Sequence, residues 1–258
     1  MLSTERCRER LRRFAAGCAD QGLDLAVVSD TRNIAYLTGF LRPDVGISDM
    51  KVVLLLVYPD RGPVLLNSQM FKPLADKVYR DEMIVYTDYD IHHKMVTHLD
   101  DALAVLREHL VSDSSKPQKI GIESRYQATA VTMLLQALYP SASMTDLSNT
   151  ILHMRRVKED DELALIRRSE SQIALAYKTV KETISEGRTE LDALLAGSAA
   201  LTKSAGERTF FYGDFVSGER SEGIGGWPTG RVLQNGDLFI FDLWTTTEGY
   251  WQRRLPTK

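Results

Sequence analysis

The chain has 258 residues, of which 43% are apolar and 26% are charged, and its formal net charge is −3. This near balance of charges offers no basic surface for a polyanion, so nucleic acid is not expected as a partner. Apolar runs fall short of the roughly 18–20 residues that span a bilayer. The charged N-terminus has no apolar core behind it, so we expect neither a membrane protein nor a secretory signal.

The first half of the chain alternates between helical and strand patterns. In chain order we expect a helix over 3–22, a strand over 23–29, a short helix over 31–40, a hairpin of strands over 52–58 and 63–67, a helix over 71–78, a strand over 83–86, a helix over 96–110, a strand over 119–123 and a helix over 127–139. Such alternation predicts an α/β layer structure around a mixed sheet.

The composition changes near residue 155. Residues 146–158 lead into a long helix over about 159–186, whose apolar positions recur mostly at steps of 3, 4 and 7, as on one helical face. Thr189 with Asp192 resembles a capping box for the next helix. We therefore expect two domains, 1–154 and 155–258.

The two cysteines, Cys7 and Cys18, fall in the first expected helix. Eleven residues of helix separate them by roughly 16 Å, which is too far for a disulfide. A reduced, cytoplasmic protein is the simplest interpretation.

The end of the chain contains a carboxylate in an apolar strand. Strands are expected over 209–215 and 238–243, and Asp242 lies inside the second. Burying such a carboxylate costs free energy unless a cation pairs with it, and in many proteins that cation is a metal ion. A hydrogen-bonded acid at a strand end is the alternative. A polar turn over 245–248 and a return strand would bring position 253 beside Asp242, and that position is Arg253.

Several motifs, in the right order, resemble those of the pita-bread metallohydrolases, the family of creatinase, prolidase and aminopeptidase P. They are NIAYLTGF at 33–40, RRVKEDDELALI at 155–166, EGRTE at 186–190, VSG at 216–218 and GDLFIFD at 236–242. The resemblance covers almost the whole chain. It implies an α/β fold, with a creatinase-like N-terminal mixed-sheet domain followed by the first part of a pita-bread α+β catalytic domain.

The resemblance also implies a metal centre in the full-length parent. Family members bind two divalent ions (Mn²⁺, Co²⁺ or Zn²⁺), which lower the pKa of a bound water. Asp242 matches the first Asp of the ligand set, whereas Arg253 takes the place of the second. The later His and two Glu ligands would lie beyond Lys258, so we expect no metal in this chain.

One further position is a candidate for substrate binding. The family often has a substrate-facing His before the turn at Gly236, and this chain has Gly225, Gly226, Trp227 and Pro228 in that region. Trp227 is therefore a candidate pocket-lining residue, with a purely structural tryptophan as the alternative. The sequence identifies no catalytic residue.

The tail suggests a frameshift hypothesis. Codons can be chosen for residues 251–258 such that deleting the base after the Trp251 codon gives Trp-Ser-Asp-Val-Tyr-Arg-Gln. Joined to Gly249 and Tyr250, this reading restores the second Asp of the family motif. We hypothesise that residues 252–258 come from a frameshift or a mistaken gene model, which the nucleotide sequence would test.

The function implied by the resemblance is cleavage of peptide bonds next to proline, by an Xaa-Pro aminopeptidase or dipeptidase that is inactive as this chain. A metal-independent C–N hydrolase of the creatinase type is a second hypothesis, and a non-catalytic pseudoenzyme or binding module is a third. The expected partners are a small peptide or another small C–N substrate and, since family members pair, a second copy in a homodimer.

Overall fold

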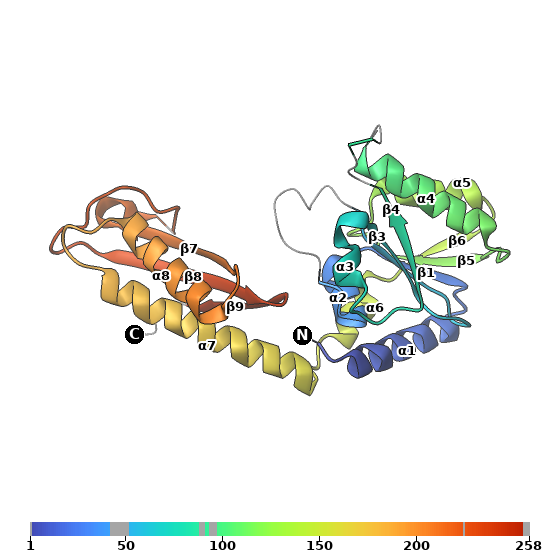
Figure 1. The fold of residues 1–258 in the computed structure, drawn as a ribbon, viewed down its shortest axis with the longest axis horizontal. Coiled ribbons are helices and arrows are strands. Elements are labelled where there is room, and N and C mark those ends of the chain that lie inside the picture. The colour runs from blue at the N-terminus through green and yellow to red at the C-terminus, as the bar shows by residue number, and fades with distance from the viewer. Residues whose placement is uncertain (1, 42–51, 88–90, 93–96, 224, 255–258) are drawn as a thin grey trace. The chain divides into compact units, whose positions relative to one another are not determined.

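The computed structural model describes residues 2–41, 52–87, 91–92, 97–223 and 225–254 (Figure 1). The chain divides into two compact units, Met1–Lys158 and Glu159–Lys258. The boundary expected near residue 155 falls among the last residues of the first unit.

The first unit contains a six-stranded mixed sheet. Its strands are β1 (Leu25–Val28), β2 (Leu54–Val57), β3 (Val64–Ser68), β4 (Glu82–Tyr86), β5 (Lys119–Ile122) and β6 (Ser143–Asp146). Their order across the sheet is β4-β3-β2-β1-β5-β6. β2 is antiparallel to both neighbours, while β1, β5 and β6 run parallel, as do β3 and β4.

Helices cover both faces of this sheet (Figure 1). They are α1 (Thr4–Asp20), α2 (Thr31–Thr38), α3 (Lys72–Ala75), α4 (His98–Ser112), α5 (Thr129–Leu138) and α6 (Ser148–Met154). In β1, Ala26 and Val28 pack with α1, α2, α3 and α6, whereas Leu25 and Val27 pack with α4 and α5. Because both faces are covered, every residue of β1, β2 and β3 is buried.

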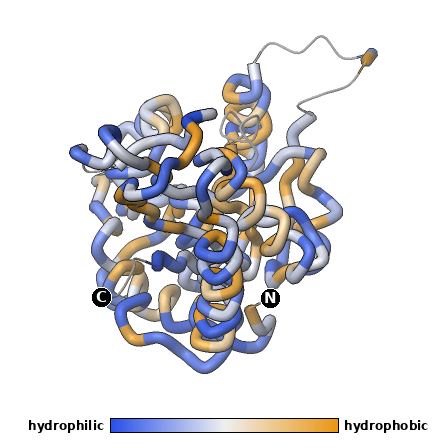
Figure 2. Tube along the Cα trace, turned by 90° about the vertical axis from the view of Figure 1, so that its left-hand side faces the viewer, coloured by the Kyte–Doolittle hydropathy of each residue, from blue (hydrophilic) through white to orange (hydrophobic). Residues whose placement is uncertain are grey.

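The second unit is a two-layer structure. Its elements are α7 (Asp160–Thr183), α8 (Glu190–Ala205), β7 (Phe210–Ser217), β8 (Phe239–Thr247) and β9 (Tyr250–Arg254). The strands form an antiparallel sheet in the order β7-β8-β9. One face of this sheet packs on the helices, with Phe215, Phe241 and Leu243 against Ile173 and Val180. Hydrophobic and hydrophilic residues alternate along the helices (Figure 2), as expected for amphipathic helices packed on one side.

The predicted fold class, a mixed-sheet α/β unit followed by part of a pita-bread domain, is confirmed, and so is the capping box of Thr189 and Asp192. The turn expected over 245–248 is wrong, because β8 continues to Thr247. Glu248 and Gly249 form a two-residue hairpin loop instead, and both have positive φ, which matches the twist of the flanking strands.

Two other local predictions need correction. The helix expected over 71–78 contains only the single turn of α3, because the Tyr79 N–H donates to the Thr38 carbonyl and ties this segment to the end of α2. β6 and α6, within residues 143–154, were not expected from the sequence. β6 is a polar strand at the sheet edge, half-buried or exposed throughout, so its sequence shows no apolar pattern.

Cys7 and Cys18 are buried in α1, and neither is part of a disulfide. Burial raises the pKa of Cys18 to about 12, so this thiol stays protonated and unreactive. Within the described ranges, the helices are too short or too polar to cross a membrane.

A buried carboxylate connects the two ends of the first unit. Glu123, which follows β5, is fully buried and accepts hydrogen bonds from the backbone N–H groups of Ser29 (2.6 Å) and Asp30 (2.8 Å) and from Asn33 Nδ2. Arg155 Nη1 donates to Asn33 Oδ1 over 2.8 Å. Burial raises the pKa of Glu123, while these donors oppose the rise. The motif at Asn33 and the motif at Arg155 are thus joined by a direct hydrogen bond, and Glu123 holds the Asn33 side chain that makes it.

We expect Glu123→Ala to destabilise the protein by about 3 kcal/mol, because it leaves the buried donors of Ser29, Asp30 and Asn33 without an acceptor. Urea unfolding followed by circular dichroism measures the change. Glu108→Ala, at an exposed position of α4, is the matched control and should change little. Equal stability of the two variants would contradict the role given to Glu123.

Candidate functional site

The face of the β7–β8–β9 sheet opposite the helices carries a cluster of acids, aromatic rings and one arginine. Side chains alternate along a strand, so residues paired across neighbouring strands share a face. The register pairs Asp214 with Asp242, Tyr212 with Trp244, and Trp244 with Arg253. We call these five residues, together with Trp227, the site face.

Asp242 is the acid that the sequence analysis singled out. It is 5% exposed, and its Oδ2 accepts a 2.8 Å hydrogen bond from Arg253 Nε and a second from Arg253 Nη2. Its Oδ1 is buried, with no hydrogen-bond partner among the described residues. The return strand therefore does bring Arg253 to Asp242, although Arg253 pairs directly with Trp244 in the register.

Arg253 is held by the acids and by an aromatic ring. Hydrogen bonding to Asp242, and the charges of Asp242 and Asp214, raise the pKa of Arg253. Its guanidinium also lies over the Trp244 ring, 5.3 Å from the ring centroid. The positive charge beside the two acids is thus supplied by a side chain of this protein, Arg253.

Asp214 was missed by the sequence analysis. It lies directly across from Asp242, and its Oδ1 accepts a 3.1 Å hydrogen bond from the Gly226 N–H. The signal that could have found it is the one that found Asp242, namely a single carboxylate in an apolar strand pattern. Asp214 lies two residues after Tyr212, so both side chains are on the same face of β7. The antiparallel register then places Asp214 opposite Asp242.

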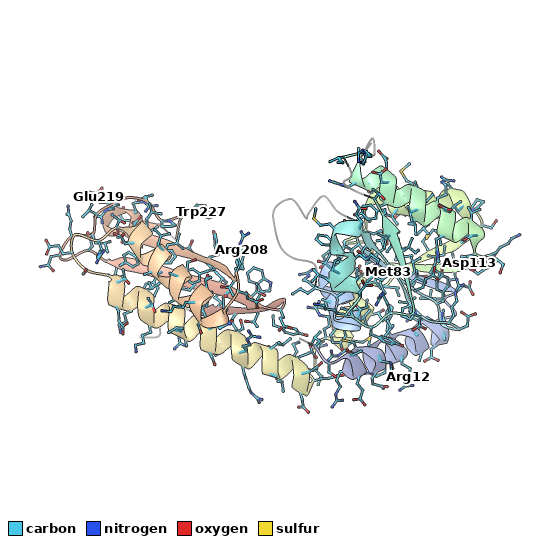
Figure 3. The ribbon with its side chains drawn as sticks, viewed as in Figure 1. Arg12, Met83, Asp113, Arg208, Glu219 and Trp227 are labelled. Carbon is cyan, nitrogen blue, oxygen red and sulfur yellow. The ribbon has the colours of Figure 1, made fainter. Side chains whose placement is uncertain are left out.

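Trp227 lies at the border of this face. Its side chain is 69% exposed and its ring packs edge-on against Tyr212, with 4.9 Å between the centroids. Tyr212 in turn lies 5.2 Å from Trp244. Figure 3 shows Trp227 extending from the loop that joins β7 to β8. We call this connection, residues 218–223 and 225–238, the Trp227 loop.

The Trp227 loop is anchored on a second buried acid. Glu190, the first residue of α8, is fully buried and accepts hydrogen bonds from Ser217, Thr229 and Arg220. Burial would raise the pKa of Glu190, but these donors and the Arg220 charge hold it below its ordinary value. Glu190 is therefore a carboxylate, and its charge is matched by Arg220.

The chemistry of these donors does not fit a metal centre. Divalent ions such as Mn²⁺ take several carboxylate or imidazole ligands. Within the described part of the chain, no three His, Cys, Asp or Glu side chains come together in a way that could hold an ion. Arg253 puts a cation on one of the two Asp242 carboxylate oxygens, Oδ2. Residues 255–258, the end of the suspected frameshift segment, lie outside the described residues.

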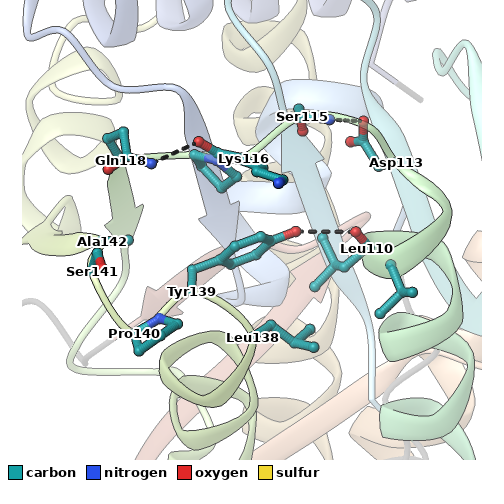
Figure 4. Close-up of a pocket in the computed structure, with 12 residues that line it drawn as sticks. Leu110, Asp113, Ser115, Lys116, Gln118, Leu138, Tyr139, Pro140, Ser141 and Ala142 are labelled. Carbon is teal, nitrogen blue, oxygen red and sulfur yellow. Dashed lines mark hydrogen bonds between the residues drawn. The ribbon is translucent and has the colours of Figure 1, made fainter.

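A shallow pocket of about 360 Å³ lies in the first unit, between the loops that follow α4 and α5 (Figure 4). Two of its polar side chains, Tyr139 and Asp113, are already engaged in hydrogen bonds. The Tyr139 hydroxyl donates to the Leu110 carbonyl, and Asp113 accepts from Arg61 and from the Ser115 N–H. This pocket is therefore a weaker candidate than the site face.

Comparisons with known proteins agree with this fold. The family described as the creatinase/prolidase N-terminal domain matches residues 10–157, more than half of the chain. Creatinase from Bacillus sp. (strain B-0618) is 25% identical over 257 residues, a match covering 97% of this chain and 59% of the relative. An Xaa-Pro dipeptidase from Lactobacillus delbrueckii subsp. lactis is 25% identical and covers 90% of this chain and 60% of its own length.

Solved structures show the same architecture. The prolidase of Thermococcus sibiricus matches 98% of this chain and 64% of its own with a TM-score of 0.74 at 17% identity. The X-Pro aminopeptidase of Thermotoga maritima gives a TM-score of 0.73 at 18% identity, covering 94% of this chain and 63% of its own. The chain thus spans about three fifths of these proteins. On the match to residues 10–157 and the shared fold, the chain belongs to the creatinase/prolidase family.

Proposed function

We propose that the site face binds the substrate of a creatinase/prolidase-family hydrolase, and that this substrate is a small peptide cleaved next to proline. The observation that carries the proposal is the pairing of Asp214 and Asp242 beside the rings of Trp227, Tyr212 and Trp244. Asp214, the acid to which Arg253 makes no hydrogen bond, attracts the cationic amino group of a short peptide, and the rings offer an apolar surface to a proline ring. The dipeptidase relative supports this substrate class.

A second candidate is a metal-independent C–N hydrolase or a non-catalytic binding protein. The Asp242–Arg253 pair favours it, because the arginine places a positive charge against the Asp242 carboxylate, where it opposes a metal cation. The creatinase relative supports a substrate other than a peptide. A divalent metal belongs to the first candidate, in which the full-length parent binds Mn²⁺, Co²⁺ or Zn²⁺.

One assay series separates the two candidates. The protein is given Ala-Pro dipeptide or creatine, each with Mn²⁺ and with a chelator. Metal-dependent release of proline supports the peptidase, whereas turnover of creatine in the chelator supports the alternative. Binding of either compound without turnover supports a binding protein.

The proposal also includes a cytoplasmic homodimer by resemblance to the family, and light scattering after size-exclusion chromatography tests the dimer.

We expect Arg253→Ala to raise the affinity for Mn²⁺ about tenfold or more, because it removes a positive charge within hydrogen-bonding distance of Asp242. Isothermal titration calorimetry measures the affinity. Arg254→Ala is the matched control, since Arg254 is the next residue but pairs with Glu170 and lies over Tyr177. Similar Mn²⁺ affinities for the two variants would mean that Arg253 does not oppose a cation at Asp242.

We expect Trp227→Ala to weaken Ala-Pro binding about five- to thirtyfold, corresponding to about 1–2 kcal/mol for one aromatic contact. Trp251→Ala is the control, because Trp251 is also an exposed tryptophan of this sheet but packs on Phe210, away from the acids. Titration calorimetry with the dipeptide compares the two. A larger loss in the Trp251 variant would place the binding surface elsewhere on the sheet.

A further inference from the structure

The Trp227 loop is attached to α8 through one carboxylate. Glu190 Oε1 accepts from the backbone N–H and the hydroxyl of Ser217, over 2.8 and 2.7 Å. Glu190 Oε2 accepts from the N–H and hydroxyl of Thr229, over 2.9 and 2.8 Å, and from Arg220 Nη1. Ser217 ends β7 and Thr229 follows Trp227 by two residues, so the acid holds both ends of the segment that carries Trp227.

Arg220 extends this attachment to Trp227 itself. Its Nη1 contacts Glu190 and Thr229 Oγ1, and its Nη2 donates to the Trp227 carbonyl over 2.8 Å. Only a planar group with several N–H donors can make these contacts together, and a lysine ammonium cannot reproduce the arrangement. Arg220 is one-third exposed, so its role is separable from the packing of the core.

The loop is also interlocked with Asp214 on the site face. The Gly226 N–H donates to Asp214 Oδ1, and the Gly226 carbonyl accepts from the Phe215 N–H over 2.9 Å. A Cβ atom on Gly225 would lie 2.5 Å from the Asp214 carboxyl, so a larger residue here would displace that side chain. The position of the Trp227 ring and the position of the Asp214 carboxylate therefore depend on one another.

We propose that Glu190 and Arg220 are positioning residues that fix Trp227 against Tyr212 at the border of the site face, and thereby determine which side chains a bound peptide can carry. The effect on selectivity rests on the proposed function of this face. The immobilisation of Trp227 does not rest on it. Neither residue belongs to the site face itself, so both act through the loop.

The immobilisation is tested by fluorescence. Trp227, Trp244 and Trp251 are the three tryptophans of the chain, so Trp244→Phe with Trp251→Phe leaves Trp227 as the sole reporter. In this background we compare Glu190→Gln, Arg220→Lys and the control Glu170→Gln, which removes an exposed ion pair between Glu170 of α7 and Arg254 of β9. Time-resolved anisotropy reports the local motion of the Trp227 ring on the nanosecond timescale.

We expect Glu190→Gln and Arg220→Lys to increase the amplitude of fast Trp227 motion about twofold, while Glu170→Gln leaves it unchanged. If Glu190→Gln does not fold, Arg220→Lys decides the question. Unchanged Trp227 motion in a folded Arg220→Lys protein overturns the proposal, because the contacts of Arg220 with Glu190 and with the Trp227 carbonyl would then not restrict the ring.

Selectivity is tested with all three native tryptophans present. We expect Arg220→Lys to reduce the preference for Ala-Pro over Ala-Ala about fivefold, measured as the ratio of dissociation constants, with little effect on thermal unfolding. If Trp227 becomes mobile while the ratio stays the same, positioning holds but the selectivity role is wrong. If neither dipeptide binds the unsubstituted protein, the proposed function is wrong, and so is the role in selectivity. Greater Trp227 motion in the variant would still support the immobilisation of Trp227 by Arg220.

Discussion

A carboxylate removed from water needs donors that replace its hydration, and three such carboxylates organise this protein. Glu123 takes backbone N–H groups from the chain that follows β1, and through Asn33 it holds Arg155. Glu190 accepts hydrogen bonds from Ser217 and Thr229, at the two ends of the segment that carries Trp227. Asp242 accepts hydrogen bonds from the Arg253 guanidinium. In each case an acid gathers groups that are distant in sequence, so the cost of burying it is offset only in the complete fold.

The geometry of the site face follows from the strand register. The hairpin loop of Glu248 and Gly249 sets which residues of β8 and β9 are opposite one another, and a shift of one residue would turn Arg253 to the helix side. The same register places Asp214 opposite Asp242. Two like charges in direct opposition are unfavourable by themselves. Arg253 and the Gly226 N–H relieve this repulsion, so the loop and the return strand both contribute to the electrostatic balance of the face.

The sequence was informative where patterns are local or motifs are ordered. The apolar strands, the amphipathic α7, the cap at Thr189 and the approach of Arg253 to Asp242 could all be read from it. Asp214 and the central role of Glu190 could not, because each depends on partners brought together by sheet pairing and by the path of a long loop. β6 and α3 were missed or overestimated because their limits are set by tertiary contacts and not by local pattern.

The anchoring of the Trp227 loop has a consequence for self-association. Strand β7 is an edge of its sheet, and unpaired N–H groups along such an edge can recruit strands from other molecules. Here the outward N–H of Phe215 donates to the Gly226 carbonyl, and that of Ser217 donates to the Glu190 carboxylate. An incoming strand would have to displace both acceptors. The residues that hold the loop therefore also protect the β7 edge against aggregation.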